Sequence, residues 1–151
     1  MKCKVRLSGA GFSLIELLVA MAVLGILVAI AYPAYTTYVQ KGNRPIAKSA
    51  LLELASRQES YYALNNSYAS QMTALGYSQT SMPLPSSSQN YYTLTIASTT
   101  NANPPSYTLQ AAPVTGSVQA TDSCQTYQLD SLGNKTNLNA SGTSLSVSGC
   151  W

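Results

Sequence analysis

The sequence contains no histidine and few charged residues. Histidine is the commonest general base and the commonest transition-metal ligand, so its absence argues against most hydrolytic and metal-dependent sites. Asp, Glu, Lys and Arg make up 9% of the chain, against about 25% in an ordinary soluble domain. Metal-ligand spacings, glycine-rich phosphate loops and cysteine–histidine pairs are also missing. We expect no catalysis, no cofactor and no metal, and we interpret Asp122 and Asp130 as surface carboxylates.

The few charges are distributed unevenly along the chain. Between residues 8 and 40 the only charged residue is Glu16, whereas the last two thirds is rich in Ser, Thr, Asn and Tyr. From residue 65 onward a single lysine accompanies two aspartates. A generic nucleic-acid binder needs clustered Lys or Arg, so the distal charges give no strong evidence for a nucleic-acid partner. The contrast divides the chain into a lipid-compatible part and a polar extramembrane part.

Residues 12–31 form an apolar run that only Ser13, Glu16 and Gly25 interrupt. As a helix this run is about 30 Å long, enough to cross the hydrocarbon core of a membrane. Basic residues lie on both sides of it, so the positive-inside rule leaves its orientation open. Paired cysteines belong in an oxidising compartment, which places the C-terminus outside. Three tyrosines follow the run and are expected to lie at the headgroup boundary of the membrane: Tyr32, Tyr35 and Tyr38.

Other interpretations of this segment are an ordinary signal peptide, a plain uncleaved anchor and a lipoprotein signal. A signal peptidase would cut after the small-residue pattern at residues 29–31, but the apolar run exceeds the usual 7–15 residues and contains a carboxylate. Lipoprotein processing at Cys3 is excluded because no apolar segment precedes that cysteine.

Glu16 is the informative residue of the apolar run. A carboxylate within a membrane helix costs roughly 2.5–3.5 kcal/mol and usually marks function. One structural explanation is a capping box, in which Glu16 bonds back to the Ser13 amide. The functional explanation needs a positive partner in the membrane. If the chain is cut after Gly11, the new amine of Phe12 lies four residues before Glu16 and supplies that charge.

The stretch from Gly11 to residue 19, GFSLIELLV, follows a short basic leader and resembles the N-terminal signature of type IV pilins and pseudopilins. The resemblance implies removal of residues 1–11 by a prepilin peptidase that cuts between Gly11 and Phe12, followed by N-methylation of Phe12. It also implies that Glu16 neutralises the Phe12 amine of an adjacent subunit during assembly. The implied partners are other pilin subunits, the peptidase, an inner-membrane assembly platform and the membrane before assembly.

The helix is expected to continue beyond the apolar segment of residues 12–39 as an amphipathic segment over residues 40–64. Gly42 and Pro45 predict a kink or break, because proline lacks a backbone donor and clashes with the preceding turn. Glu53 and Arg57 form an i,i+4 pair. A stripe at 3–4 spacing is expected to pack on the protein's own sheet: Ala47, Ala50, Leu51, Leu54, Gln58, Tyr61 and Tyr62.

Residues 65–151 are expected to form a globular β domain. Asn, Gly, Pro and Ser make residues 64–90 a connecting loop. Residues 91–95 and 107–111 predict one hairpin, and residues 126–130 and 135–138 predict a tighter one. The expected fold is α+β, with a long helix on a small antiparallel sheet of about four strands.

Cys124 and Cys150 predict a disulfide, because an even pair of cysteines in an exported region is typical of one. The cysteine-bounded loop, residues 127–136 and the terminal Cys150–Trp151 pair resemble minor pilins of Gram-negative bacteria. The leading functional expectation is a pilus subunit that serves adhesion, twitching motility or DNA uptake, held in the inner membrane and then exposed on the cell surface. The alternatives are a pseudopilin of a type II secretion system and a DNA-binding competence pilin.

Overall fold

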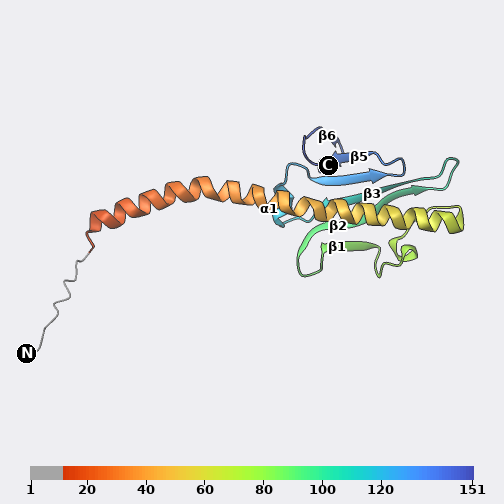
Figure 1. The fold of residues 1–151 in the computed structure, drawn as a ribbon, viewed down its shortest axis with the longest axis horizontal. Coiled ribbons are helices and arrows are strands. Elements are labelled where there is room, and N and C mark those ends of the chain that lie inside the picture. Colours follow the sequence, from red (N-terminus) through yellow and green to blue (C-terminus); the bar gives the residue numbers. More distant parts are fainter. Residues whose placement is uncertain (1–11) are drawn as a thin grey trace, which may run out of the picture. The chain divides into compact units, whose positions relative to one another are not determined.

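The computed structural model describes residues 12–151, which form two units, one ending at Thr36 and the other comprising Thr37–Trp151. One helix, α1 (Leu14–Asn65), contributes turns to both units. Figure 1 shows α1 in red to yellow and the strands in green to blue.

The first unit consists of N-terminal turns of α1 whose side chains are exposed. Leu and Ala are the commonest residues in these turns, and both are strong helix formers. An 18-residue window of α1 has a mean hydropathy of 2.8, which makes it long and apolar enough to cross a membrane, and none of it is buried. A helix that is apolar on every side needs lipid or other protein around it. The length and composition expected of a membrane-spanning segment are therefore present.

In the second unit, one face of α1 packs on the sheet. Residues three or four apart share a helix face, and the buried side chains follow this spacing. The expected stripe is confirmed and extends further toward the N-terminus than residue 47. Its buried members are Gln40, Arg44, Ala47, Leu51, Leu54 and Gln58.

A kink or break was expected at residues 42–45; the break is wrong, because α1 is continuous from Leu14 to Asn65. An interior proline costs a helix about 3 kcal/mol or more. Arg44 and Ala47 flank Pro45, and both are buried against the rest of the unit. Their contacts hold this turn in helical conformation, so tertiary packing overrides local propensity.

The strands form one antiparallel sheet in which each strand pairs with the next one along the chain. The α+β class is confirmed, but the sheet has six strands where about four were expected. The strands are β1 (Ser81–Pro85), β2 (Asn90–Thr100), β3 (Ser106–Pro113), β4 (Thr126–Asp130), β5 (Lys135–Leu138) and β6 (Ser144–Leu145).

Residues 64–90 are only partly the loop that was expected, since they contain the short 3-10 helix η1 (Met72–Leu75) and strand β1. Pro83 and Pro85 cannot donate ladder hydrogen bonds, and this composition suggested a loop. Proline is tolerated here because β1 is at an edge of the sheet and pairs with β2 alone.

Both expected hairpins are confirmed. Strands β2 and β3 pair from Tyr92↔Pro113 to Thr100↔Ser106 and are longer than expected. Strands β4 and β5 have the expected bounds and pair from Thr126↔Leu138 to Leu129↔Lys135. A second 3-10 helix, η2 (Val118–Thr121), lies in the connection between β3 and β4.

The core lies between α1 and the sheet and includes the expected disulfide. Cys124 and Cys150 are bonded, with their Cα atoms 5.5 Å apart, and both are buried. Alternate strand residues point into this core. They are Tyr92 and Leu94 from β2, Tyr107, Leu109 and Ala111 from β3, and Tyr127 and Leu129 from β4.

Candidate functional site

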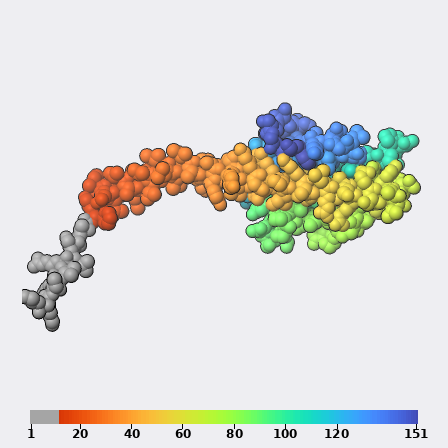
Figure 2. All heavy atoms as spheres, viewed as in Figure 1, coloured from red at the N-terminus to blue at the C-terminus, as the bar shows by residue number. Residues whose placement is uncertain are grey.

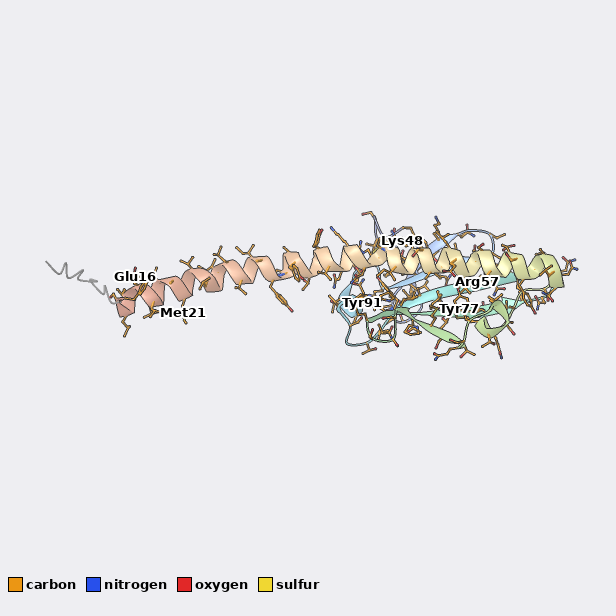
Figure 3. All side chains as sticks on the ribbon, turned by 60° about the horizontal axis from the view of Figure 1, so that its bottom comes forward. Glu16, Met21, Lys48, Arg57, Tyr77 and Tyr91 are labelled. Atoms are coloured by element: carbon orange, nitrogen blue, oxygen red, sulfur yellow. A yellow bond between two sulfur atoms is a disulfide. The ribbon has the colours of Figure 1, made fainter. Side chains whose placement is uncertain are left out.

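Phe12 and Glu16, the two residues expected to act in assembly, are at the start of the described chain and are both exposed. Figure 3 shows Glu16 in the first turn of α1. The backbone N–H of Glu16 donates to the Ser13 carbonyl at 3.1 Å. Within residues 12–151 no hydrogen bond joins the Glu16 carboxylate to the Ser13 amide, so the capping box is not formed. Residues 1–11, including Cys3 and Gly11, lie outside the described residues.

A buried ion pair joins α1 to the segment that precedes β4. The Arg44 Nη2 and Nε atoms donate to the two carboxylate oxygens of Asp122 at 2.6 and 3.0 Å. Arg44 is 9% exposed and Asp122 is 2% exposed, so the expectation of a surface carboxylate is wrong for Asp122. The hydrogen bond that Arg44 donates to Asp122 raises the pKa of Arg44 and outweighs the opposing effect of burial. Removal of one partner of such a pair strongly destabilises the fold, because the charge of the other partner stays buried.

Amide side chains extend this ion pair into a network. Gln119 Nε2 donates to the Tyr92 hydroxyl at 2.6 Å and to Asp122 Oδ2 at 3.4 Å. Gln40 Nε2 donates to the Val118 carbonyl and to Thr121 Oγ1, both at 2.9 Å. The network fixes one turn of α1 against η2 and the residues beside Cys124. Its position and burial indicate a structural role.

Burial raises the pKa of two tyrosines in the core. Desolvation raises the pKa of Tyr92 to about 12, although the hydrogen bond from Gln119 opposes this rise. Desolvation is also the largest cause of the raised pKa of Tyr107, to which a hydrogen bond to Glu59 contributes. These phenols therefore remain neutral throughout the physiological pH range.

Asp130 organises the turn between β4 and β5. Its Oδ1 accepts hydrogen bonds from the backbone N–H groups of Leu132 and Asn134 at 2.9 and 2.8 Å, and its Oδ2 accepts one from Asn134 Nδ2. Desolvation raises the pKa of Asp130, but the hydrogen bonds from Asn134, Leu132 and Gly133 outweigh it and lower the pKa overall. The carboxylate is partly exposed, and its contacts indicate a turn-forming role.

Two lysines from distant parts of the sequence lie on one aromatic pair. The Lys48 Nζ atom is 6.0 Å from the centroid of the Tyr127 ring, and the Lys135 Nζ atom is 5.4 Å from that of Trp151. The Tyr127 and Trp151 rings meet edge to face, with centroids 5.4 Å apart. We call Lys48, Tyr127, Lys135 and Trp151 the lysine–aromatic patch.

Two surface hollows are present in the second unit. One, of about 590 Å³, is lined by Arg57, Tyr77, residues of β1 and the loop that follows it. The other, of about 540 Å³, is lined by Lys135, Trp151 and the polar segment that contains Ser146 and Ser148. In the part of the chain that the structure describes, no group of three or more His, Cys, Asp or Glu side chains could hold a metal ion.

Two protein families match this sequence. The family described as “Type IV minor pilin ComP, DNA uptake sequence receptor” matches residues 33–128, more than half of the chain. The “Prokaryotic N-terminal methylation motif” matches residues 7–32. The chain belongs to the type IV minor pilins. The resemblance seen in the sequence is confirmed, and the chain is a structural pilin subunit of a family that assembles into filaments.

The pilin is also similar to parts of other pilins. The “Type IV major pilin protein PilA” of Myxococcus xanthus is 33% identical over 67 residues, which cover 44% of this chain and 30% of that protein. The “Type IV wide pilus major component PilA4” of Thermus thermophilus is 37% identical over 65 residues, or 43% of this chain and 50% of that protein. The pilin thus spans at most half the length of the curated relatives it matches. The solved structure of a type IV pilin from Shewanella oneidensis is 21% identical in sequence, with a TM-score of 0.43. The matched region covers 74% of this chain and 97% of the Shewanella chain.

The sequence did not indicate the lysine–aromatic patch or the Arg44–Asp122 pair. For Arg44 a signal existed, since it lies three residues before Ala47 on the stripe that packs on the sheet. Lys48 and Lys135 carry no such signal, because only the docking of α1 on the sheet brings them together.

Proposed function

We propose that this pilin takes part in DNA uptake as a minor subunit of a type IV pilus. The observation that carries this proposal is the match of residues 33–128 to a family described as a DNA uptake sequence receptor. The matched residues comprise the sheet-packed part of α1, strands β1 to β3 and the first residues of β4. The low charge of the distal sequence counted against a DNA partner, but the fold places Lys48 and Lys135 in one patch.

Processing and location form the second part of the proposal. A prepilin peptidase cuts between Gly11 and Phe12, and Phe12 is then N-methylated. The mature pilin is held in the inner membrane and is then added to a surface filament by the assembly platform. The match of residues 7–32 to the methylation motif and the exposed apolar turns of α1 support this sequence of events. N-terminal sequencing of the mature protein should begin at Phe12, whereas a start at Tyr32 would indicate an ordinary signal peptide.

Glu16 has a specific role in this assembly. The free amine of Phe12 must enter an apolar filament core, where an unpaired ammonium is heavily penalised. The exposed Glu16 carboxylate has no described partner within its own chain and can neutralise the amine of an adjacent subunit. A carboxylate at this position is unfavourable in a simple anchor but useful in an assembling subunit.

Substitution of Glu16 tests this role. Glu16→Gln keeps the shape and removes the charge, so it should be inserted and cleaved normally but reach sheared filaments at about a tenth of the wild-type level, as expected for a loss near 1.4 kcal/mol. Glu16→Asp should be intermediate because the charge remains with a shorter reach. Glu53→Gln, a matched change at an exposed carboxylate in the second unit, should incorporate normally. Normal incorporation of Glu16→Gln would remove charge neutralisation from the proposal.

Deletion of the gene tests the biological function. Cells without this pilin should lose natural transformation and uptake of DNA into a nuclease-resistant state, and a plasmid copy of the gene should restore both. Twitching, surface attachment and protein secretion should be measured in the same strains. Loss of twitching or attachment with normal transformation would favour those functions instead, and loss of secretion alone would identify a pseudopilin.

A further inference from the structure

The lysine–aromatic patch gathers positive charge that the second unit does not neutralise. Lys48 is contributed by α1 and Lys135 by β5, and neither forms an ion pair with a described carboxylate. Each side-chain carboxylate of this unit has hydrogen-bonding partners outside the patch. Asp122 bonds to Arg44, Glu53 to Arg57, Glu59 to Tyr107, and Asp130 to Asn134.

The two lysines lie against one pair of contacting aromatic rings. Both ammonium groups lie near aromatic rings that contact each other edge to face. The Trp151 Nε1 atom donates to the Thr136 carbonyl at 3.0 Å, which fixes the indole against β5. Burial, and then the charges of Arg44 and Lys135, lower the pKa of Lys48, so each cation adds to the positive potential at the other.

The surface beside the patch is polar and hollowed. The 540 Å³ hollow extends from Lys135 and Trp151 along the serine-rich segment of residues 144–149. Hydroxyl and backbone N–H groups there are suitable donors to phosphate oxygens. Figure 2 shows the C-terminal residues, in dark blue, beside the orange and yellow turns of α1, so this face combines both ends of the unit's sequence.

We propose that Lys48 and Lys135 bind backbone phosphates of double-stranded DNA, with Tyr127 and Trp151 positioning the two ammonium groups. This proposal rests on the function proposed above and assigns the surface that performs it. Two convergent, unpaired lysines beside a polar hollow complement a polyanion, and such contacts position DNA without reading its sequence.

The experiment uses the full-length pilin in detergent and a short fluorescein-labelled DNA duplex. Fluorescence anisotropy measures affinity over a range of salt concentrations for wild type and for the double variant Lys48→Gln/Lys135→Gln. The variant should bind about tenfold more weakly at moderate salt. A plot of the logarithm of the association constant against the logarithm of the salt concentration should become less steep by about 2, since two phosphate contacts are lost. Trp151 is the single tryptophan, so its fluorescence should change when DNA binds to wild type.

A matched control separates the patch from net charge. Gln79→Glu/Gln89→Glu also lowers the net charge by two, at exposed positions on either side of β1, the strand at the opposite edge of the sheet from β6. This control should keep the wild-type salt slope and bind within about threefold of wild type, because it removes no phosphate contact. Equal melting temperatures of all three proteins will show that the variants fold.

Two results would overturn the proposal in distinguishable ways. If wild type binds the duplex and the lysine variant binds with the same affinity and slope, the patch is not the DNA surface, and the proposed function stands. If wild type binds no DNA, the patch assignment fails regardless of the deletion phenotype. The DNA-uptake function fails separately if cells lacking the pilin transform normally.

Discussion

Up to Thr36, α1 buries no side chain in this chain, whereas between Gln40 and Gln58 it buries one at every third or fourth position. The backbone is the same α-helix in both parts, so the difference lies only in the pattern of side chains. Turns that are apolar all round can be surrounded by lipid or by the helices of other subunits. Turns with one apolar stripe pack on the sheet of their own chain. This contrast fits the assembly proposed above, in which the first part leaves the membrane for the filament and the second part keeps its own packing.

The largest effect is expected at the buried ion pair of the second unit. Arg44→Met leaves the Asp122 carboxylate buried without its partner and should lower the free energy of unfolding by about 3–5 kcal/mol. Arg44→Met/Asp122→Leu should recover most of this loss, since no charge then stays buried. Denaturant unfolding of the full-length protein in detergent measures both. Equal stabilities of the single and double variants would contradict this explanation.

A pair of identical substitutions tests the contrast between the two parts of α1. Leu51→Ala removes a fully buried side chain and should lower the free energy of unfolding by about 2–5 kcal/mol. Leu24→Ala truncates an exposed side chain of the first unit and should change it by less than about 0.5 kcal/mol. Melting temperatures in detergent will distinguish them. A large loss for Leu24→Ala would mean that the first unit contributes to folding of the isolated subunit.

Alkaline pH should destabilise the second unit through its buried phenols. The pKa of Tyr92 is about 12 in the folded protein and about 10 in an unfolded chain. Its contribution to stability is therefore complete below pH 10 and is lost as the pH rises from about 10 to 12, because only the unfolded chain ionises there. The difference in melting temperature between wild type and Tyr92→Phe should shrink over this interval. Parallel curves for the two proteins would exclude Tyr92 as a source of the loss.

The smallest effect is expected at the exposed ion pair of the same helix. Arg57 donates to Glu53 at 2.8 Å, and both side chains are substantially exposed. An exposed i,i+4 pair is worth about 0.3–0.5 kcal/mol, so Glu53→Gln should change the free energy of unfolding by no more than this. High salt should abolish the difference. A loss comparable to that of Arg44→Met would show that exposure does not separate the two ion pairs.

The sequence predicted the parts of the fold that depend on local pattern. Hydrophobic periodicity gave α1 and its packed face, and alternation with turn residues gave both hairpins, including the bounds of β4 and β5. The sequence-based prediction failed where contacts with other parts of the fold decide the secondary structure. Ser81–Pro85 contains two prolines and is a strand only because it is at an edge. Pro45 stays helical because Arg44 and Ala47, on either side of it, are buried.

The candidate site was predictable only where its residues adjoin in sequence. Gly11, Phe12 and Glu16 belong to one continuous signature, so inspection of the sequence could assign them roles that remain to be tested. Asp122 was taken for a surface residue because its partner, Arg44, lies 78 residues away. Lys48 and Lys135 are separated by a similar distance, and composition alone suggested that positive charge was too sparse for DNA.

The strand order of the sheet also sets the order in which the protein can fold. Since β1 to β6 pair strictly with their neighbours along the chain, hairpins can form one after another as synthesis proceeds, and such local contacts favour rapid folding. Packing of α1 on the sheet is completed later than the hairpins, because some of its contacts are with residues near the C-terminal end of the sheet. Arg44 of α1 can form its ion pair only after Asp122 has been made, and Cys124 can form its disulfide only after Cys150 has been made. Until Val118, Thr121 and Asp122 have been made, Gln40 and Arg44 of α1 lack their main polar partners, so these contacts form only after strands β1 to β3.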